Sequence, residues 1–176
     1  KVHGNVKIPA SKSMAHRALI CASLSDGTSI VSNVTNSKDI EATVGCMKAL
    51  GAIIKQIDET TYEVTGTNLF KQEGNITCNA NESGSTLRFL IPLAACTNAK
   101  VKFLGQGRLL QRPMDVYENE FKKQNIEFNQ SNQEIIVSGN LKAKDYVVQG
   151  DISSQFITGF MFVLPLLDQD STLTIT

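Results

Sequence analysis

The sequence has little of what marks several large classes of protein. Its 17 Lys and Arg residues balance 17 Asp and Glu residues, so no excess charge favours nucleic acid or an acidic membrane surface as a partner. The longest apolar run, at 160–167, is too short to cross a membrane and contains Pro165. The first residues include no apolar segment of the kind found in secretion signals, so we expect a cytoplasmic protein.

Cysteine and histidine are also scarce, and neither forms a recognisable site. The cysteines form no CxxC pair and lie far apart, at Cys21, Cys46, Cys78 and Cys96. Isolated cysteines in apolar surroundings are more typical of free buried thiols in a reducing compartment than of disulfides or metal ligands. His3 and His16 lack partner residues at metal-binding spacing, and we expect His16 to be structural or to support a site. We therefore predict no bound metal.

Common catalytic motifs are absent as well. The chain has no HExxH, GxSxG, P-loop or GxGxxG pattern. Its isolated acids form no obvious general acid and base pair; they are Asp26, Asp39, Asp115 and Asp151. The sequence thus offers groups that could bind anions, but no convincing machinery for proton transfer.

Three stretches have the spacing of helices and begin alike. They start near Ser11, Glu82 and Ser153, about 70 residues apart. In each, apolar residues recur at i, i+3, i+4 and i+7, the pattern of one buried helix face. The residues expected on these faces are Ala15, Ala18, Leu19 and Ala22, then Leu87, Leu90, Ile91 and Ala94, then Ile157, Phe160, Met161 and Leu164. Pro92 and Pro165 fall late in the second and third copies, where we expect a kink or an early end.

The segments around these helices repeat too. A strand is expected before each one, at 6–8, 76–78 and 146–148. The first two helices are followed by a strand (28–34 and 100–104), a second helix (39–50 and 114–123) and a hairpin (52–57 with 62–65, and 126–129 with 134–137). The sequence therefore predicts an α/β fold of repeated β-α-β-α-β-β units around buried helices. Two units are complete, and the third is partial.

The third copy extends only to its second strand, at 171–176, so we expect the natural protein to continue beyond it. No Gly/Ser-rich or Pro-rich linker divides the chain. We expect residues 1–176 to form a single domain truncated at its C-terminal end. The first helices of the three units should pack together as its centre, because the third is apolar almost all round.

The arginines are concentrated in or near the repeated helix starts. Only four residues are arginines, and all lie in or beside these starts or the GQGRLLQRPMD segment: Arg17, Arg88, Arg108 and Arg112. Arginine offers a rigid fork for carboxylate or phosphate. The helix starts themselves carry Lys12-Ser13, Gly84-Ser85 and Ser153-Ser154, and free N–H groups at a helix N-terminus attract anions. Plain N-capping and, for Arg88 and Arg108, inter-unit salt bridges remain alternatives.

Four segments carry a family resemblance that runs through essentially the whole chain. PASKSMAHRALI, ESGSTLRFL, GRLLQRPM and GDISSQFITGFMFVLPLL resemble, in this order, the substrate-binding motifs of the 5-enolpyruvylshikimate-3-phosphate synthases. The resemblance implies a protein of two domains, each of three β-α-β-α-β-β units, of which this chain is most of one. It implies transfer of the enolpyruvyl group of phosphoenolpyruvate to the 5-hydroxyl of shikimate 3-phosphate, with release of phosphate and no cofactor.

The resemblance also implies roles for individual residues. Lys12 is implied to be catalytic, facing the charge that develops on phosphoenolpyruvate. Shikimate 3-phosphate is implied to contact Lys12, Ser13, Arg17, Ser153, Ser154 and Gln155. Phosphoenolpyruvate, whose position glyphosate occupies in the family, is implied to contact Lys12, Gly84 and Arg112. The remaining ligands and the main proton-transfer groups are implied to lie in the second domain, so this chain by itself is expected to be inactive.

One position departs from the family pattern, and two other functions compete. Family members commonly have Asn-Ala-Gly-Thr where this chain has Glu82-Ser83-Gly84-Ser85. A carboxylate at Glu82 suits anionic substrates poorly, so we leave it out of the predicted contacts. The alternatives are the related transferase that acts on UDP-N-acetylglucosamine and a non-catalytic anion-binding module of the same fold.

Overall fold

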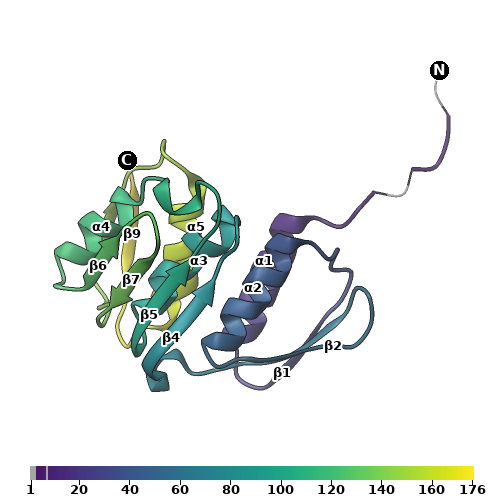
Figure 1. Cartoon of the computed structure of the whole chain (residues 1–176), viewed down its shortest axis with the longest axis horizontal. Helices are drawn as coiled ribbons and strands as arrows, with labels where there is room; N and C mark the ends of the chain where they lie inside the picture. The colour runs from purple at the N-terminus through teal and green to yellow at the C-terminus, as the bar shows by residue number, and fades with distance from the viewer. Residues whose placement is uncertain (1–2, 7) are drawn as a thin grey trace.

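The computed structural model of the chain describes residues 3–6 and 8–176 (Figure 1). Its first unit begins with a helix and ends with a hairpin; the elements are α1 (Lys12–Leu24), β1 (Thr28–Val31), α2 (Lys38–Ala49), β2 (Ile53–Gln56) and β3 (Tyr62–Thr65). Both β1 and β2 pair antiparallel with β3, giving the strand order β1-β3-β2. A short 3-10 helix, η1 (Leu69–Lys71), leads to the next unit.

The second unit is complete. Its elements are β4 (Glu73–Asn79), α3 (Gly84–Ala94), β5 (Asn98–Leu104), the 3-10 helix η2 (Leu109–Gln111), α4 (Asp115–Lys122), β6 (Glu127–Gln130) and β7 (Ile135–Ser138). Strands β4 and β5, which α3 connects, pair in parallel. The hairpin of β6 and β7 adds antiparallel strands, giving the order β4-β5-β7-β6.

The third unit repeats the opening of the second. It consists of β8 (Asp145–Val148), α5 (Ser154–Val163), the 3-10 helix η3 (Leu164–Leu166) and β9 (Thr172–Ile175), with β8 and β9 paired in parallel. Helix α5 ends one residue before η3, whose second residue is Pro165. The early end expected from this proline is confirmed, because proline cannot donate the next helical hydrogen bond. In the second unit, by contrast, Pro92 is accommodated inside α3, near its C-terminal end.

The predicted repeat is confirmed, with differences at the start of the first unit. Residue 7 of the predicted 6–8 strand lies outside the described residues, while residues 6 and 8 are exposed and belong to no strand. The described part of this unit therefore reads α-β-α-β-β, and the segment before α1 extends away from the body (Figure 1). The strand predicted over 28–34 ends at Val31, because Asn33 has φ 59° and turns the chain.

Serine hydroxyls cap the starts of α1, α2, α3 and α5. The side chains of Ser11, Ser37, Ser83 and Ser153 each accept a backbone N–H from the first turn of α1, α2, α3 and α5. Each hydroxyl satisfies one of the N–H groups that a helix start leaves unpaired. The remaining N–H groups of these first turns stay available to a ligand.

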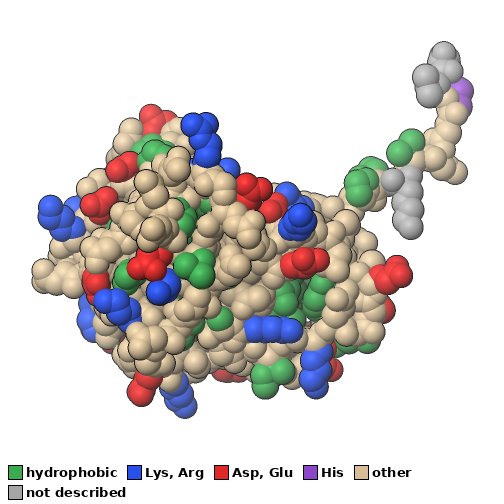
Figure 2. All heavy atoms as spheres, in the orientation of Figure 1, with side chains coloured by type: hydrophobic (Ala, Val, Ile, Leu, Met, Phe, Trp, Pro, Cys, Tyr) green, Lys and Arg blue, Asp and Glu red, His purple; other side chains and the backbone are tan. Residues whose placement is uncertain are grey.

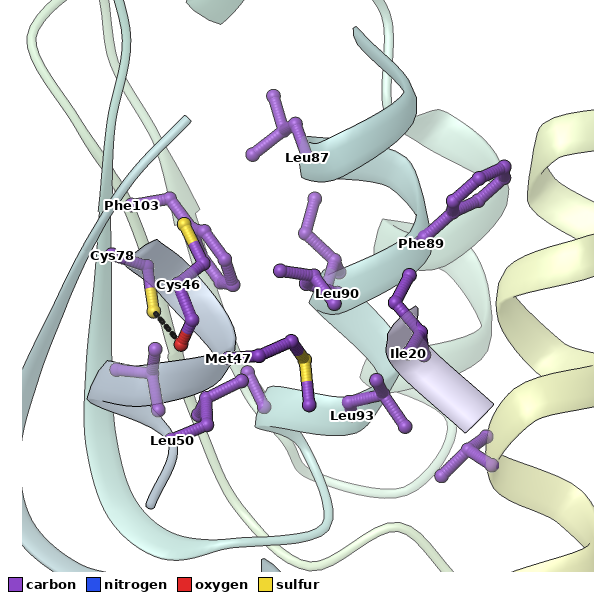
Figure 3. Packing of buried hydrophobic residues seen from close by; sticks show 14 of the residues in the cluster. Ile20, Cys46, Met47, Leu50, Cys78, Leu87, Phe89, Leu90, Leu93 and Phe103 are labelled. Carbon is purple, nitrogen blue, oxygen red and sulfur yellow. Dashed lines mark hydrogen bonds between the residues drawn. The ribbon is translucent and has the colours of Figure 1, made fainter. Parts of the chain in front are cut away.

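Helix α3 lies at the centre of the core, between α2 and α5. Its Leu87, Leu90 and Leu93 pack with Met47 and Leu50 of α2 (Figure 3). The third copy packs into this core as predicted, with Phe160 buried and Ile157 and Leu164 packed against it. Met161, expected on the same face of α5, is instead 63% exposed. Ala18 of α1 is also exposed, and the buried side of that helix instead includes His16. Met161 and Ala18 were both mispredicted for the same reason. In α1 and α5 the apolar residues extend around the helix beyond the side that other elements cover.

The cysteines are free, as predicted, but one of them is not buried. Cys46, Cys78 and Cys96 are buried, and burial raises the pKa of the Cys96 thiol to about 12. Cys21 is exposed on α1. On the face shown in Figure 2, positive and negative side chains are intermingled, in keeping with the balanced charge of the sequence.

Candidate anion-binding site

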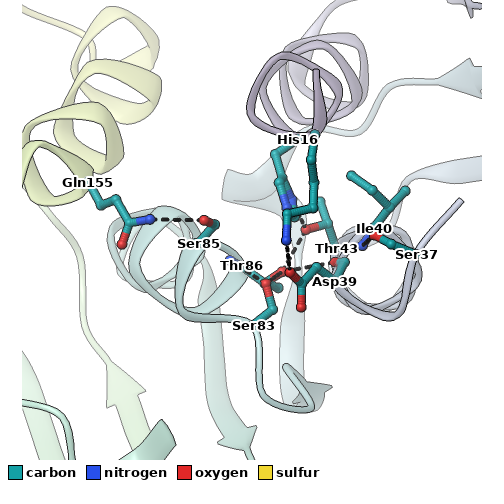
Figure 4. A network of polar contacts seen from close by, with 10 residues as sticks. His16, Ser37, Asp39, Ile40, Thr43, Ser83, Ser85, Thr86 and Gln155 are labelled. Carbon is teal, nitrogen blue, oxygen red and sulfur yellow. Dashed lines mark hydrogen bonds and ion pairs between the residues drawn. The ribbon is translucent and has the colours of Figure 1, made fainter. Parts of the chain in front are cut away.

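The starts of α3 and α5 are joined by side-chain hydrogen bonds. Gln155, in the first turn of α5, donates from Nε2 to Ser85 Oγ at 2.9 Å (Figure 4). The oxygen of the same amide accepts a hydrogen bond from Arg88 Nη1 at 2.8 Å. Two predicted helix starts, about 70 residues apart in sequence, therefore meet at one place. These two hydrogen bonds fix the orientation of the Gln155 amide.

Arg112 lies over the start of α3. A Cβ atom added to Gly84 would come within 2.5 Å of Arg112 Nη1 and 4.0 Å of Arg88 Nη1. Arg112 directly follows the short helix η2, whose Leu109 and Leu110 are buried, and its backbone carbonyl accepts a hydrogen bond from Gln130 at 2.9 Å. The absence of a side chain at Gly84 lets the arginine approach the free N–H groups of the helix start.

Arg17 connects α1 with α5. Its Nη1 donates to the carbonyl of Ser13 at 3.0 Å, and its Nη2 donates to Thr158 Oγ1 at 3.2 Å. Its guanidinium also lies 5.1 Å from the centre of the Phe89 ring of α3, within the range of a cation–π contact. The side chain therefore bridges the three repeated helices.

Lys12, the first residue of α1, forms an ion pair with Asp39 in the first turn of α2. Lys12 Nζ and Asp39 Oδ2 are 2.5 Å apart, and the side chains are 55% and 31% exposed. Asp39 was named in the sequence only as an isolated acid, because an acidic residue in a first turn is an ordinary feature of helices. The structure places it as the partner of the predicted catalytic lysine.

A buried polar network lies behind these residues. His16 Nδ1 is 2.7 Å from Thr43 Oγ1, which is 2.7 Å from Thr86 Oγ1, which in turn is 2.8 Å from Ser83 Oγ (Figure 4). Burial is the main cause that lowers the pKa of His16 from 6.5 to about 4. The expectation that His16 is structural or supporting fits this position. Thr43 and Thr86 were missed, because threonine in a helix carries no signal of its partners.

The arginines of the site concentrate positive charge. Burial, followed by the charge of Arg112, lowers the pKa of Arg88 from its ordinary value. Within residues 3–6 and 8–176, none of the six ion pairs includes an arginine. Two guanidinium groups without a carboxylate partner, beside the positive end of α3, form an arrangement that a bound anion would stabilise.

The remaining predicted residues lie at the same helix starts. Ser13 and Ser154 are exposed, and Ser153 is half-buried as the N-cap of α5. Lys12 is joined to the others indirectly, through Asp39, whose backbone carbonyl accepts a hydrogen bond from Thr86 at 3.3 Å. Arg108 is exposed at the start of η2. The face is thus open and polar, with its cations arranged around the first turns of α1, α3 and α5.

Comparison with known proteins assigns the chain to a family. The family model of EPSP synthase (3-phosphoshikimate 1-carboxyvinyltransferase) matches residues 1–176. The chain belongs to the EPSP synthase family. The resemblance found in the sequence motifs is therefore confirmed over the whole chain.

Relatives in this family are considerably longer. The chain is 48% identical over 178 residues to the 3-phosphoshikimate 1-carboxyvinyltransferase of Clostridium kluyveri, covering 100% of this chain and 41% of that protein. It is 47% identical over 189 residues to the one from Clostridioides difficile, with coverages of 100% and 43%. The chain therefore spans about two fifths of the length of these relatives.

A solved structure supports the fold. EPSP synthase from Acinetobacter baumannii superposes with a TM-score of 0.82 and 18% identity, over 98% of this chain and 40% of that protein. The predicted enolpyruvyl transferase-like α/β fold is confirmed by this match.

Two further properties concern what the described residues contain. Across residues 3–6 and 8–176, no group of three or more His, Cys, Asp or Glu side chains is placed to hold a metal ion. None of the helices in the described part of this family member is long and apolar enough to cross a membrane.

Proposed function

We propose that this chain supplies one wall of the active site of a transferase that moves the enolpyruvyl group of phosphoenolpyruvate to the 5-hydroxyl of shikimate 3-phosphate. The observation that carries the proposal is the meeting of Gly84, Arg112, Arg88 and Gln155 where α3 and α5 begin. Membership of the EPSP synthase family supports the same reaction. Both substrates are anions, and holding them together requires fixed cations and N–H donors.

In this proposal the residues divide between the two substrates. Arg112 and the backbone at Gly84 bind phosphoenolpyruvate, and Arg17 and Ser13 bind the carboxylate and ring of shikimate 3-phosphate. Ser153 and Ser154 bind the 3-phosphate, and Gln155 lies against the ring. Lys12 contacts both substrates. An approaching anion competes with Asp39 for Lys12, which is feasible because the pair is largely exposed and such pairs are weak.

The reaction proceeds by addition and then elimination. The 5-hydroxyl loses its proton as its oxygen bonds to C2 of phosphoenolpyruvate, and C3 gains a proton, giving a tetrahedral intermediate. Loss of phosphate from C2 and of a proton from C3 then restores the double bond. Lys12 and Arg112 stabilise the charge carried by the phosphate and carboxylate groups during both steps.

We further propose that residues 1–176 are most of one domain, and that a second domain supplies the opposite wall and the proton-transfer groups. The support is that the curated relatives are more than twice as long as this chain. Closure of two walls over the substrates would exclude water. We propose a cytoplasmic location, supported by the four free cysteines, which suit a reducing compartment.

The proposal is tested by measuring phosphate release from phosphoenolpyruvate and shikimate 3-phosphate. The samples are the 176-residue chain and a chimaera in which it replaces the matching part of the Clostridium kluyveri relative. We expect turnover by the chimaera, about a thousandfold less in its Lys12→Met variant, and none by the chain alone. Robust turnover by the chain alone would contradict the two-wall arrangement.

Direct binding separates this function from its closest alternative. Calorimetry on the chimaera should detect shikimate 3-phosphate and not UDP-N-acetylglucosamine. Binding of the sugar nucleotide instead would contradict the assigned substrate, whatever the turnover result.

A further inference from the structure

A continuous run of buried hydrogen bonds links three helices behind the open face. It passes from His16 on α1 to Thr43 on α2 and to Thr86 on α3, with 2.7 Å between successive polar atoms. These three residues are each 1% exposed or less. Water does not compete for such bonds, and in apolar surroundings they constrain the groups that they join.

Each residue of this run lies in the sequence within one helical turn after a residue at the open face. His16 follows Lys12 by four residues, and Thr43 follows Asp39 by four. Side chains separated by four positions lie on the same side of a helix. Thr86 follows Gly84 by two residues and donates a hydrogen bond to the backbone carbonyl of Asp39 at 3.3 Å. Thr86 therefore links the run to Asp39, whose carboxylate binds Lys12, and also to Ser83 Oγ, 2.8 Å away at the start of α3.

We propose that His16, Thr43 and Thr86 form a positioning relay that fixes Asp39, and through it the ammonium group of Lys12, relative to the start of α3. This inference rests on the function proposed above, in which Lys12 faces both substrates. An exposed ion pair holds a long, flexible lysine side chain only weakly. Catalytic groups need to be held to within about 0.5 Å, which requires support from buried neighbours.

The relay has a preferred direction of donation. The single hydroxyl proton of Thr86 has two acceptors in reach, Ser83 Oγ at 2.8 Å and the Asp39 carbonyl at 3.3 Å. The relay requires that His16 Nδ1–H donates to Thr43, Thr43 to Thr86, and Thr86 to the carbonyl, which cannot donate, while Ser83 Oγ–H donates to Thr86. His16 is then neutral with a bare Nε2, and Nε2 has no hydrogen-bond partner in the structure. The opposite direction would bury an N–H without an acceptor, the more costly arrangement.

The groups around His16 keep its ring neutral. Burial is the largest cause of its lowered pKa, which the carboxylate of Asp39 opposes and the charges of Lys12 and Arg17 reinforce. The ring also meets Phe89 of α3, edge to face, with 6.3 Å between ring centres. A neutral imidazole can serve as the donor that begins the relay.

The first test reads the tautomer of His16 directly. Imidazole ¹⁵N NMR of the 176-residue chain at neutral pH should show a neutral ring protonated at Nδ1. A ring protonated mainly at Nε2, or a charged ring, would overturn the relay. This measurement needs no substitution, so it stands even if a variant fails to fold.

The second test compares two buried threonines. Thr86→Val removes a relay hydroxyl, whereas Thr97→Val removes an equally buried hydroxyl that bonds Ala94 O at 2.8 Å outside the relay. We expect Thr86→Val to change the Lys12 ammonium resonance and to weaken shikimate 3-phosphate binding about fivefold, with recovery in Thr86→Ser. Thr97→Val should leave both readouts as in the original chain.

The outcomes separate the relay from the function on which it rests. If the original chain binds no shikimate 3-phosphate, yet the Lys12 resonance depends on Thr86, the proposed function loses support and the relay stands. If the chain binds the ligand, and Thr86→Val matches Thr97→Val in both readouts, the relay is overturned.

Discussion

Gly84 leaves space that a neighbouring arginine fills. A methyl group there would lie 2.5 Å from Arg112 Nη1, so the guanidinium would have to move away from the start of α3. That guanidinium is the end of a flexible, exposed side chain, so it can move, but it then leaves the position from which we propose that it binds phosphoenolpyruvate. In the chimaera we therefore expect Gly84→Ala to weaken both glyphosate and phosphoenolpyruvate about tenfold or more, as measured by inhibition and substrate titrations.

The matched control for this change is Gly45→Ala in α2. A methyl group at Gly45 would meet nothing within 4 Å, so both constants should remain as in the parent. Equal constants for Gly84→Ala and the parent would contradict the placement of Gly84 at the phosphoenolpyruvate site.

His16 should make the stability of the chain depend on pH. The folded chain keeps the ring neutral down to about pH 4, whereas the unfolded chain takes up a proton near 6.5. Because the unfolded state binds the extra proton, acidification from 6.5 to 4 favours unfolding, by about 3 kcal/mol over the window. Urea unfolding at successive pH values should show this loss.

The variant His16→Asn provides the comparison, since an amide can still hydrogen-bond to Thr43 but does not titrate. Its stability should change less steeply over the same window. Parallel curves for the two proteins would show that His16 is not the group responsible.

Single residues were predictable where their local sequence explains their position. Lys12 and Arg112 could be named because helix starts and arginines near them have a recognisable chemistry, whereas Gln155 was named only through the family resemblance of its motif. Asp39, Thr43 and Thr86 could not, because their partners are 27 to 47 residues distant in the sequence. The position of His16 inside the core likewise depends on helices α2 and α3, which its own helix does not reveal.

At the scale of elements, the contact between α3 and α5 depends on Gly159. A Cβ there would overlap Tyr117 Oη and lie 2.8 Å from the Arg88 carbonyl, to which Tyr117 donates a hydrogen bond at 2.6 Å. We expect Gly159→Ala to destabilise the chain by about 1–3 kcal/mol, measured by urea denaturation. Gly45→Ala should instead stabilise it by up to about 1 kcal/mol, because alanine favours helix. Stabilisation of both variants would contradict the close packing of α3 and α5.

Most helices and hairpins could be predicted, because their apolar periods and polar turns are local properties. The errors are at places where distant packing decides. Met161 looked buried from the period of α5, but no described element covers that side of the helix. The short helices η1, η2 and η3 were not predicted, and η2 is the element that places Arg112.

At the scale of the molecule, repetition explains why the helix starts meet. The second and third units each place a helix between two parallel strands, so the N-terminal end of each helix follows the carboxyl end of its first strand. Packing α3 between α2 and α5 then brings these ends to one face (Figure 1). The 70-residue repeat could be read from sequence, but this mutual orientation could not.

The central claim is that the first turns of α1, α3 and α5 form one anion-binding face. It is tested most directly by titrating the 176-residue chain with shikimate 3-phosphate and following its backbone amide resonances by NMR. The account predicts that the amides of Ser13, Ser85 and Ser154 shift together with a single dissociation constant, and that Arg17→Met weakens all three responses. Shifts confined to one helix, or three unrelated constants, would contradict a shared site.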